Sequence, residues 1–252
     1  MPNTTPYPSA PPAPPPVNSS LSGTEITSMK DSVTPDLDDG GINFYCLRLI
    51  AMWARVTAYL KTIKHGHMEE PWTPNSTYQQ IASDMFQLET SYPAAHRFKT
   101  VKFYDRFPAD LEKHRDYWAP WIFSQIVYHS VRAVANHPFL HLRKTNGRHR
   151  LCPPSFLQHA TDQAILHSSW VARILQMCVE KELSILDPFI GHLASVAATI
   201  CLFLQFSRDP ELVSAASGHF EGLKAFLNVQ ATQHLHLRYV VHLPSSKESS
   251  EI

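Results

Sequence analysis

The chain has 252 residues, of which 44% are hydrophobic and 17% charged, and its 22 basic and 22 acidic side chains cancel to a formal net charge of zero. This length is enough for one large domain or two small ones with a sizeable core. The zero net charge excludes a global electrostatic field that would steer the chain to nucleic acid or to an anionic membrane.

The first forty residues differ in composition from the rest. Residues 1–40 contain nine of the twenty prolines and many serines and threonines. Such a segment buries too little apolar surface to offset the entropy lost on ordering. We therefore predict that residues 1–40 are a disordered tail.

Apolar residues recur at spacings of three and four from Gly41 onward, which predicts an amphipathic helix that ends near Gly66. The expected apolar stripe of this helix is Phe44, Leu47, Ile50, Trp53, Val56, Leu60 and Ile63. A second helix is predicted to begin at Ser76, because Gln79 three residues later completes a capping-box pattern. Its expected apolar face is Tyr78, Ile81, Met85 and Leu88.

An aromatic-rich stretch over residues 96–108 is predicted to be irregular. A third helix is expected from about Tyr117 to Ala135. Asn136 suits its C-terminal cap, and Pro138 blocks its continuation.

Three more helices are marked by their start signals. The fourth is predicted to open at Ser155, with Gln158 three residues on. Asp187 and Asp209 are each followed by proline, whose missing N–H costs nothing in a first helical turn, so they predict the starts of the fifth and sixth helices. Residues 234–242 suit either a strand or a helix.

We predict an all-α fold, an irregular multi-helix bundle of about six helices around one core. The expected division is a disordered tail over 1–40, a helical domain over 41–230 and a divergent C-terminal tail over 231–252. Polar residues interrupt the most apolar stretch, residues 189–206. That pattern favours a buried helix over a membrane span, and we expect no membrane contact.

Motifs for catalysis and cofactor binding are not found in the sequence. It has eight glycines, without a dinucleotide-binding or phosphate-binding loop, a nucleophile elbow or a zinc-protease motif. The cysteines do not have a Cys-x-x-Cys spacing; they are Cys46, Cys152, Cys178 and Cys201. We therefore predict a non-enzyme without catalytic residues, cofactor or metal site, with reduced cysteines as small apolar core residues.

Several polar clusters have a functional and a plainer interpretation. The first are His65 and His67 with Glu69 and Glu70 as metal ligands, and Asp36, Asp38 and Asp39 as a cation site. The plainer interpretations, a polar helix end and a solvated acidic stretch, are favoured. The basic residues Arg143, Lys144, Arg148 and Arg150 could contact phosphate or an import receptor, but a solvated loop is favoured.

Three histidines fall on the predicted third and fourth helices. His129 and His137 are two helical turns apart, which is too far for them to share one metal ion. His137 could hydrogen-bond a helix end. For His167, on an apolar stripe, we expect a hydrogen-bonded core histidine.

Nine short strings occur in order between residues 42 and 228. They are FYCLRL (44–49), WARV (53–56), PWTPNS (71–76), HRF (96–98), YHS (128–130), NHPFL (136–140), PSFLQ (154–158), HSSW (167–170) and DPFIG (187–191). Together they resemble the fungal-specific transcription factor domain, the middle homology region found downstream of binuclear zinc clusters.

The resemblance implies an all-helical regulatory domain of a nuclear protein, which restrains or relays activation and has no catalytic residues. It implies that DNA is contacted by a separate N-terminal module in which six cysteines hold two zinc ions. Four cysteines cannot supply six ligands, so we expect no sequence-specific DNA binding by this chain. The expected partners are other transcription-factor subunits or regulators; a small-molecule effector and a homo- or hetero-oligomer remain open.

Two further hypotheses stay open. Members of this family continue through more helices, so a truncated gene product, a divergent paralogue and a mispredicted reading frame are all compatible with residues 231–252. A truncated chain would expose apolar helix faces, self-associate and titrate partners of its relatives. The other alternative is an all-α small-ligand binder or enzyme. It requires a closed cavity with several convergent polar groups, lined by Trp53, Trp118, Trp121 and Trp170.

Overall fold

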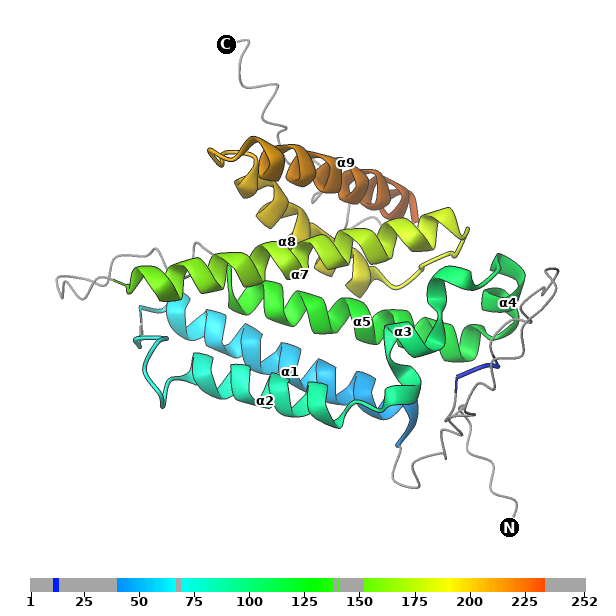
Figure 1. Cartoon of the computed structure of the whole chain (residues 1–252), viewed down its shortest axis with the longest axis horizontal. Helices are drawn as coiled ribbons and strands as arrows, with labels where there is room; N and C mark the ends of the chain where they lie inside the picture. The colour runs from blue at the N-terminus through cyan, green and yellow to red at the C-terminus, as the bar shows by residue number, and fades with distance from the viewer. Residues whose placement is uncertain (1–10, 14–39, 67–68, 138–139, 141–151, 234–252) are drawn as a thin grey trace, which may run out of the picture.

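The computed structural model describes residues 11–13, 40–66, 69–137, 140 and 152–233. Within these ranges it contains eight α-helices, two short 3-10 helices and no strand, which confirms the all-α prediction (Figure 1). The six long helices are α1 (Gly41–Lys64), α2 (Thr77–Ser91), α5 (Arg115–Ala135), α7 (Pro154–Glu180), α8 (Pro188–Leu204) and α9 (Pro210–Gln233).

The stretch predicted to be irregular, residues 96–108, is instead largely helical. It contains the last residue of η1 (Ala94–His96), α3 (Phe98–Val101), η2 (Phe103–Asp105) and the first residue of α4 (Pro108–Lys113). The prediction was wrong because these helices are too short to show a periodic apolar stripe. They are held by burial of single large residues, among them Phe103 and Leu111, which are fully buried.

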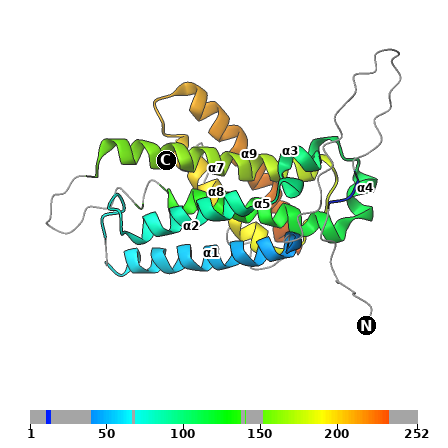
Figure 2. The ribbon, with the colours of Figure 1, turned by 60° about the horizontal axis from the view of Figure 1, so that its bottom comes forward.

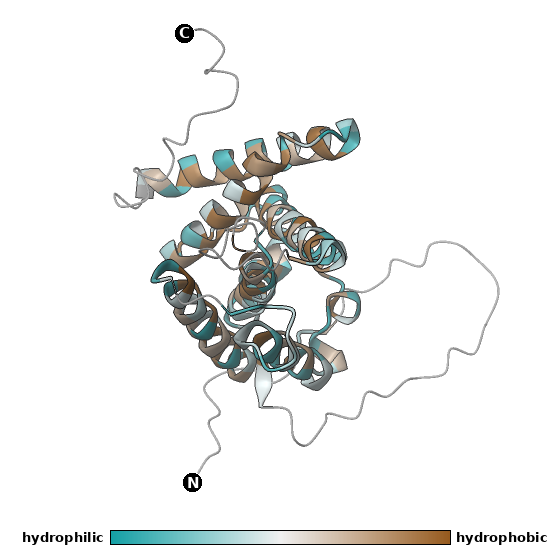
Figure 3. Cartoon of the chain, turned by 90° about the vertical axis from the view of Figure 1, so that its left-hand side faces the viewer, coloured by the Kyte–Doolittle hydropathy of each residue, from teal (hydrophilic) through white to brown (hydrophobic). Residues whose placement is uncertain are grey.

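Helix α5 is the central helix of the bundle. It contacts α1 on one side and α7 and α8 on the other, and α9 covers α7 and α8. Figures 1 and 2 show this order, with α1 and α2 together at one edge and α9 at the other. Brown, apolar residues in Figure 3 face the space enclosed by the helices, and teal residues lie mostly outside. The core is therefore built from the inward faces of all six long helices.

The buried stripe of α1 agrees with the predicted one at Val56 and Ile63 but differs from it in the first half of the helix. Phe44, Leu47 and Ile50 are 47%, 67% and 43% exposed. The residues that face α5 and α2 are Ile42, Tyr45, Cys46, Leu49, Met52, Val56, Tyr59 and Ile63. Both sets follow spacings of three and four, and the second set includes tyrosines whose hydroxyls need partners. Periodicity alone could not choose between them.

Capping residues predicted the helix ends more reliably than periodicity predicted the buried face of α1. Asp187 caps α8, because its Oδ1 accepts a hydrogen bond from the Phe189 N–H at 2.9 Å. Asp209 accepts from the Glu211 N–H at 3.0 Å in front of α9. Asn136 is the C-cap of α5 as predicted, and its Oδ1 also accepts the Tyr78 hydroxyl at 2.6 Å, which ties α5 to α2.

Of the two predicted serine caps, one is confirmed. Ser76 caps α2, since its Oγ accepts from the Gln79 N–H at 3.2 Å. The cap predicted at Ser155 was wrong. Helix α7 begins one residue earlier, at Pro154, and its N-cap Pro153 makes no side-chain bond. Proline at the first helical position lacks one of the N–H groups that are unpaired at a helix start, so the helix begins there without a serine cap.

This difference predicts a contrast between two Ser→Ala variants. Ser76→Ala should lower the free energy of unfolding by about 1–2 kcal/mol, because the buried hydroxyl also donates to the Pro71 carbonyl at 2.9 Å. Ser155→Ala, at an exposed position without a cap bond, should change it by less than about 0.5 kcal/mol. Urea denaturation followed by circular dichroism measures both. Equal losses would contradict the assignment of caps.

Candidate functional site

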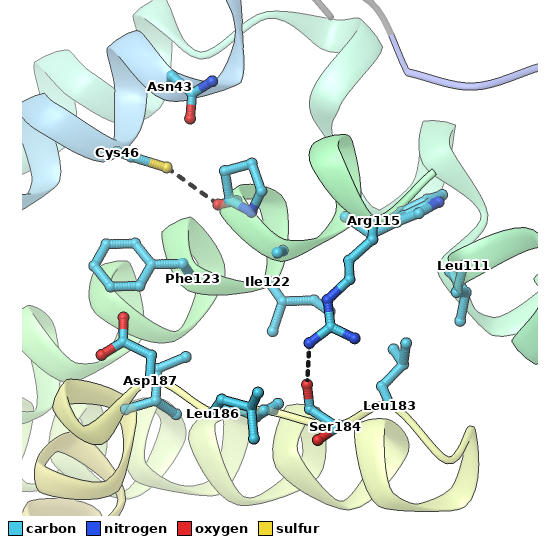
Figure 4. Close-up of a pocket in the computed structure, with 15 residues that line it drawn as sticks. Asn43, Cys46, Leu111, Arg115, Ile122, Phe123, Leu183, Ser184, Leu186 and Asp187 are labelled. Carbon is cyan, nitrogen blue, oxygen red and sulfur yellow. Dashed lines mark hydrogen bonds between the residues drawn. The ribbon is translucent and has the colours of Figure 1, made fainter. Parts of the chain in front are cut away.

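A pocket of about 390 Å³ lies where the first half of α5 faces the start of α1 and the segment 183–187, which joins α7 to α8 (Figure 4). Leu111, Ile122, Phe123, Leu183 and Ile190 give it a mainly apolar lining. Its volume lies in the range of small-molecule sites. The pocket is therefore large enough for a small apolar ligand.

One wall of the pocket is an interior proline of α5. Pro120 has no N–H, so it cannot donate the usual helical bond to Asp116. Its own carbonyl accepts the Cys46 thiol of α1 at 3.1 Å, as the dashed line in Figure 4 shows. Burial raises the pKa of Cys46 to about 12. The thiol thus stays protonated at neutral pH and is a structural group, since only the thiolate is a good nucleophile.

The opposite wall is held in place by hydrogen bonds to its backbone. Arg115 of α5 donates from Nη2 to the Ser184 carbonyl at 2.8 Å, and Gln230 of α9 donates to the Ile185 carbonyl. Asp187, at the end of this segment, is engaged as the cap of α8. Most polar groups around the pocket are therefore already paired within the protein.

Two lining residues have a polar group without a partner among the described residues. The side-chain amide of Asn43 makes no such hydrogen bond, whereas the Nε1 of Trp118 lacks an acceptor but is covered by protein and does not face the pocket space. The lining residues include no nucleophile beside a general base. Such a site can bind an apolar molecule with an acceptor group, but it lacks the arrangement needed for nucleophilic or acid–base catalysis.

The four tryptophans proposed to share one cavity do not line a common pocket, although Trp118 and Trp121 pack on each other with ring centres 5.5 Å apart. Only Trp118 lines the pocket. Trp121 is fully buried and donates to the His96 carbonyl at 2.7 Å, Trp53 packs on Phe189, and Trp170 lies over His129. The prediction of a shared lining was wrong because these residues lie on three helices and on different faces of them.

The structure pairs two histidines that the sequence did not connect. The Nδ1 atoms of His129 on α5 and His167 on α7 are 2.8 Å apart, so one ring donates and the other accepts. Burial and the positive charges of His167 and Arg132 lower the pKa of His129 to about 3. Burial and the charge of Arg132 lower the pKa of His167 to about 4. Both rings are thus neutral near pH 7. His167 is hydrogen-bonded and buried, as expected.

No group of three or more metal-ligating side chains exists among the residues that the structure describes. Glu69 accepts the Thr77 N–H at 2.5 Å at the start of α2, and His67 lies outside the described ranges. So do Asp36, Asp38 and Asp39, the basic residues Arg143, Lys144, Arg148 and Arg150, and residues 234–242. His137 meets a helix end, with its backbone N–H bonded to the Val134 carbonyl.

The cysteines are free thiols, and three of them are buried as predicted: Cys46, Cys178 and Cys201. Burial raises the pKa of Cys178 to about 12 and that of Cys201 to about 11, which leaves them unreactive. None of the described helices is both long enough and apolar enough to cross a lipid bilayer.

Neither a family model nor a solved structure matches the chain. Curated proteins do. The chain is 25% identical over 201 residues to an uncharacterized transcriptional regulatory protein of Schizosaccharomyces pombe, a match that covers 75% of this chain and 23% of the relative. It is 21% and 22% identical to the Zn(2)-C6 fungal-type transcription factors FTF2 and FTF1a of Fusarium oxysporum, over 71% of this chain and 16% of each relative.

The chain thus spans about a fifth of the length of the curated relatives that it matches. The identity is low, but each match extends over more than two thirds of this chain, and all three relatives are named as regulators of transcription. The chain is therefore a distant relative of fungal transcriptional regulators.

Proposed function

We propose that this chain is a transcription-regulatory module of the fungal type, corresponding to the middle homology region, which acts in the nucleus through contacts with other proteins or with a bound effector. The observation that carries the proposal is the similarity to fungal transcriptional regulators over 71–75% of the chain. The resemblance of nine ordered strings to the same kind of domain supports it.

Sequence-specific DNA recognition is not part of the proposed role of this chain. A binuclear zinc cluster takes six cysteine ligands, and this sequence has four, three of which are buried on different helices. The net charge of zero gives no general attraction to DNA phosphates. Regulation would therefore pass through the surface of the helical bundle or through its pocket, and the protein would not act as an enzyme.

A tethering experiment tests the regulatory role. The full chain is fused to an unrelated DNA-binding domain in yeast and a reporter gene is read out. We expect at least a threefold change in reporter expression, and a weaker change with the core variant Trp121→Ala, which destabilises the bundle. Nuclear accumulation of a fluorescent fusion is expected as well. A reporter unchanged by the folded chain would contradict the proposal.

A mobility-shift assay with the purified chain tests the proposal that the chain does not recognise a DNA sequence. We expect retardation of DNA only at low salt and without sequence preference. Tight, site-selective binding would contradict the absence of a DNA-recognition role.

The pocket favours a bound effector as the trigger of regulation. It offers about 390 Å³ of mainly apolar space next to the side-chain amide of Asn43, which makes no hydrogen bond to another described residue. An apolar molecule with one polar group fits this description.

Filling the pocket should abolish binding of an apolar probe. Ala119 is an exposed residue of α5 that lines the pocket, so Ala119→Trp places an indole in the opening without touching the core. Nile red should bind the wild-type chain with a blue-shifted emission, and its affinity should fall at least tenfold in the variant. Ala54→Trp, on the exposed face of α1, is the matched control. Equal dye binding by both variants would show that the pocket is not the binding site.

A further inference from the structure

Residues 11–13 lie against the helical bundle, far along the chain from their contacts. They belong to the proline-rich sequence SAPPAPPP (residues 9–16), which we predicted to be part of a disordered tail. The short blue segment in Figures 1 and 2 runs beside α4 in both views. The rest of residues 1–40, apart from Gly40, lies outside the described ranges.

The contact is made by one arginine. Arg106, just before α4, donates from Nη2 to the Pro12 carbonyl at 2.9 Å and from Nη1 to the Ala13 carbonyl at 2.5 Å. A planar guanidinium presents its donors as a fork, and here the two ends of the fork meet two successive carbonyls. One side chain thereby binds two successive carbonyl groups of the segment.

Arg106 is also held by contacts within the helical bundle. Its Nε donates to the Val101 carbonyl at 3.2 Å, its Nη1 also pairs with Asp110 at 2.9 Å, and its Cζ lies 5.1 Å from the centre of the Trp118 ring. Lys181, at the end of α7, donates to the Arg106 carbonyl at 2.8 Å. With residues 11–13 in place, the side chain of Arg106 is only 1% exposed. Such a site is preorganised, so little side-chain entropy is lost when it binds.

Charge and backbone chemistry indicate which ligand suits the site. Asp110 already neutralises the guanidinium, so a second carboxylate would gain little and neutral acceptors are preferred. A polyproline II segment has neutral carbonyls that make no hydrogen bonds within the chain, and proline fixes its backbone in advance. Proline-rich segments are recognised in this way by grooves that combine aromatic side chains with hydrogen-bond donors.

We propose that Arg106, Asp110 and Trp118 form a docking site for a polyproline II segment, and that residues 11–13 of the same chain occupy it as an intramolecular ligand. Residues 14–39 tether the segment and keep its effective concentration near the site high. The docked segment covers a site next to the pocket, because Trp118 belongs to both.

Photo-crosslinking in the full chain tests the docking. With p-benzoylphenylalanine in place of Ala10, irradiation should link position 10 to the region 103–118. The double variant Pro11→Gly/Pro12→Gly, which removes the fixed backbone, should lower this yield at least fivefold. Arg106→Lys keeps the charge but loses the fork and should do the same. Circular dichroism verifies the fold of each variant, and if Arg106→Lys unfolds, the proline variant alone decides.

A peptide added in trans tests the chemistry of the site. A fluorescent peptide with the sequence SAPPAPPP should bind the Pro11→Gly/Pro12→Gly chain at least fivefold more tightly than the wild-type chain, whose site is filled. A peptide with every proline replaced by glycine is the control and should bind at least tenfold more weakly. Equal binding to both chains, or unchanged crosslinking in the proline variant, would overturn the proposal. Stronger competition by an acidic peptide would show an anion site instead.

Discussion

Replacing Trp121 with alanine should lower the free energy of unfolding by about 3–5 kcal/mol, the largest loss expected from a single truncation in this chain. Trp121 is 0% exposed and packs on Phe98, Phe103 and Trp118 with ring centres 5.2–5.5 Å apart. Its indole N–H donates to the His96 carbonyl at 2.7 Å. The variant leaves a cavity and removes the hydrogen bond to the His96 carbonyl, and urea denaturation followed by circular dichroism measures the loss.

Two variants separate these contributions. Trp121→Phe keeps much of the ring packing but removes the hydrogen bond, and a loss of about 1–3 kcal/mol is expected. Trp53→Ala removes a half-buried tryptophan of α1 that contacts Phe189, and it should cost less than Trp121→Ala. If Trp53→Ala were as destabilising as Trp121→Ala, the core would not be centred on α5.

Acidification should unfold the protein through the pair of His129 and His167. Their pKa values in the folded chain, about 3 and about 4, lie below the ordinary value of 6.5. The neutral pair therefore contributes its full stability above pH 6.5. As the pH falls below 6.5, these histidines bind protons in the unfolded chain but not in the folded one. The free energy of unfolding therefore decreases until about pH 3. Between pH 6.5 and 4.5 we expect a loss on the order of 2–5 kcal/mol.

Variants of single histidines identify the source of this pH dependence. His167→Asn removes one of the two titrating rings, while the asparagine can still hydrogen-bond to His129, so the slope of stability against pH should fall by about half. His114→Asn, at a side chain that is 37% exposed, is the matched surface variant. Burial also lowers the pKa of His137 and His219, so a part of the slope, with the same sign, does not depend on the pair. An unaltered slope in His167→Asn would contradict the role of the pair.

Local chemistry explains which parts of the fold were predictable. Asp187 and Asp209 cap their helices as expected, because a cap is settled by a side chain and an N–H two or three residues away. The face of α2, with Tyr78, Ile81 and Met85, was also predictable, since that helix has one apolar stripe. Helix α1 has two possible apolar stripes in its first half, and which of them is buried depends on how α1 packs against α5 and α2.

The contacts of the candidate site could not be predicted from the sequence, because they join distant segments. The pocket brings together the start of α1, Pro120 of α5 and the segment 183–187, and no spacing in the sequence connects these three. His129 and His167 are 38 residues apart, and their pairing required α5 to pack against α7. Arg106 meets Pro12 across 94 residues. A residue pattern encodes periodicity and local hydrogen bonds, whereas these contacts depend on how separate helices pack.

The sequence by itself determined the all-α class, the starts of most of the long helices and the kind of regulator that the chain resembles. These properties follow from side-chain periodicity, caps and ordered strings of residues, all of which act over a few positions. Only the tertiary structure decided which stripe of α1 is buried, that a pocket opens beside Trp118, that two histidines share a proton, and that Arg106 holds a proline-rich segment. Each of these depends on the packing of helices that are far apart in the sequence. The packing buries polar groups, and a buried polar group is stable only with a hydrogen-bond partner, which here lies far along the chain.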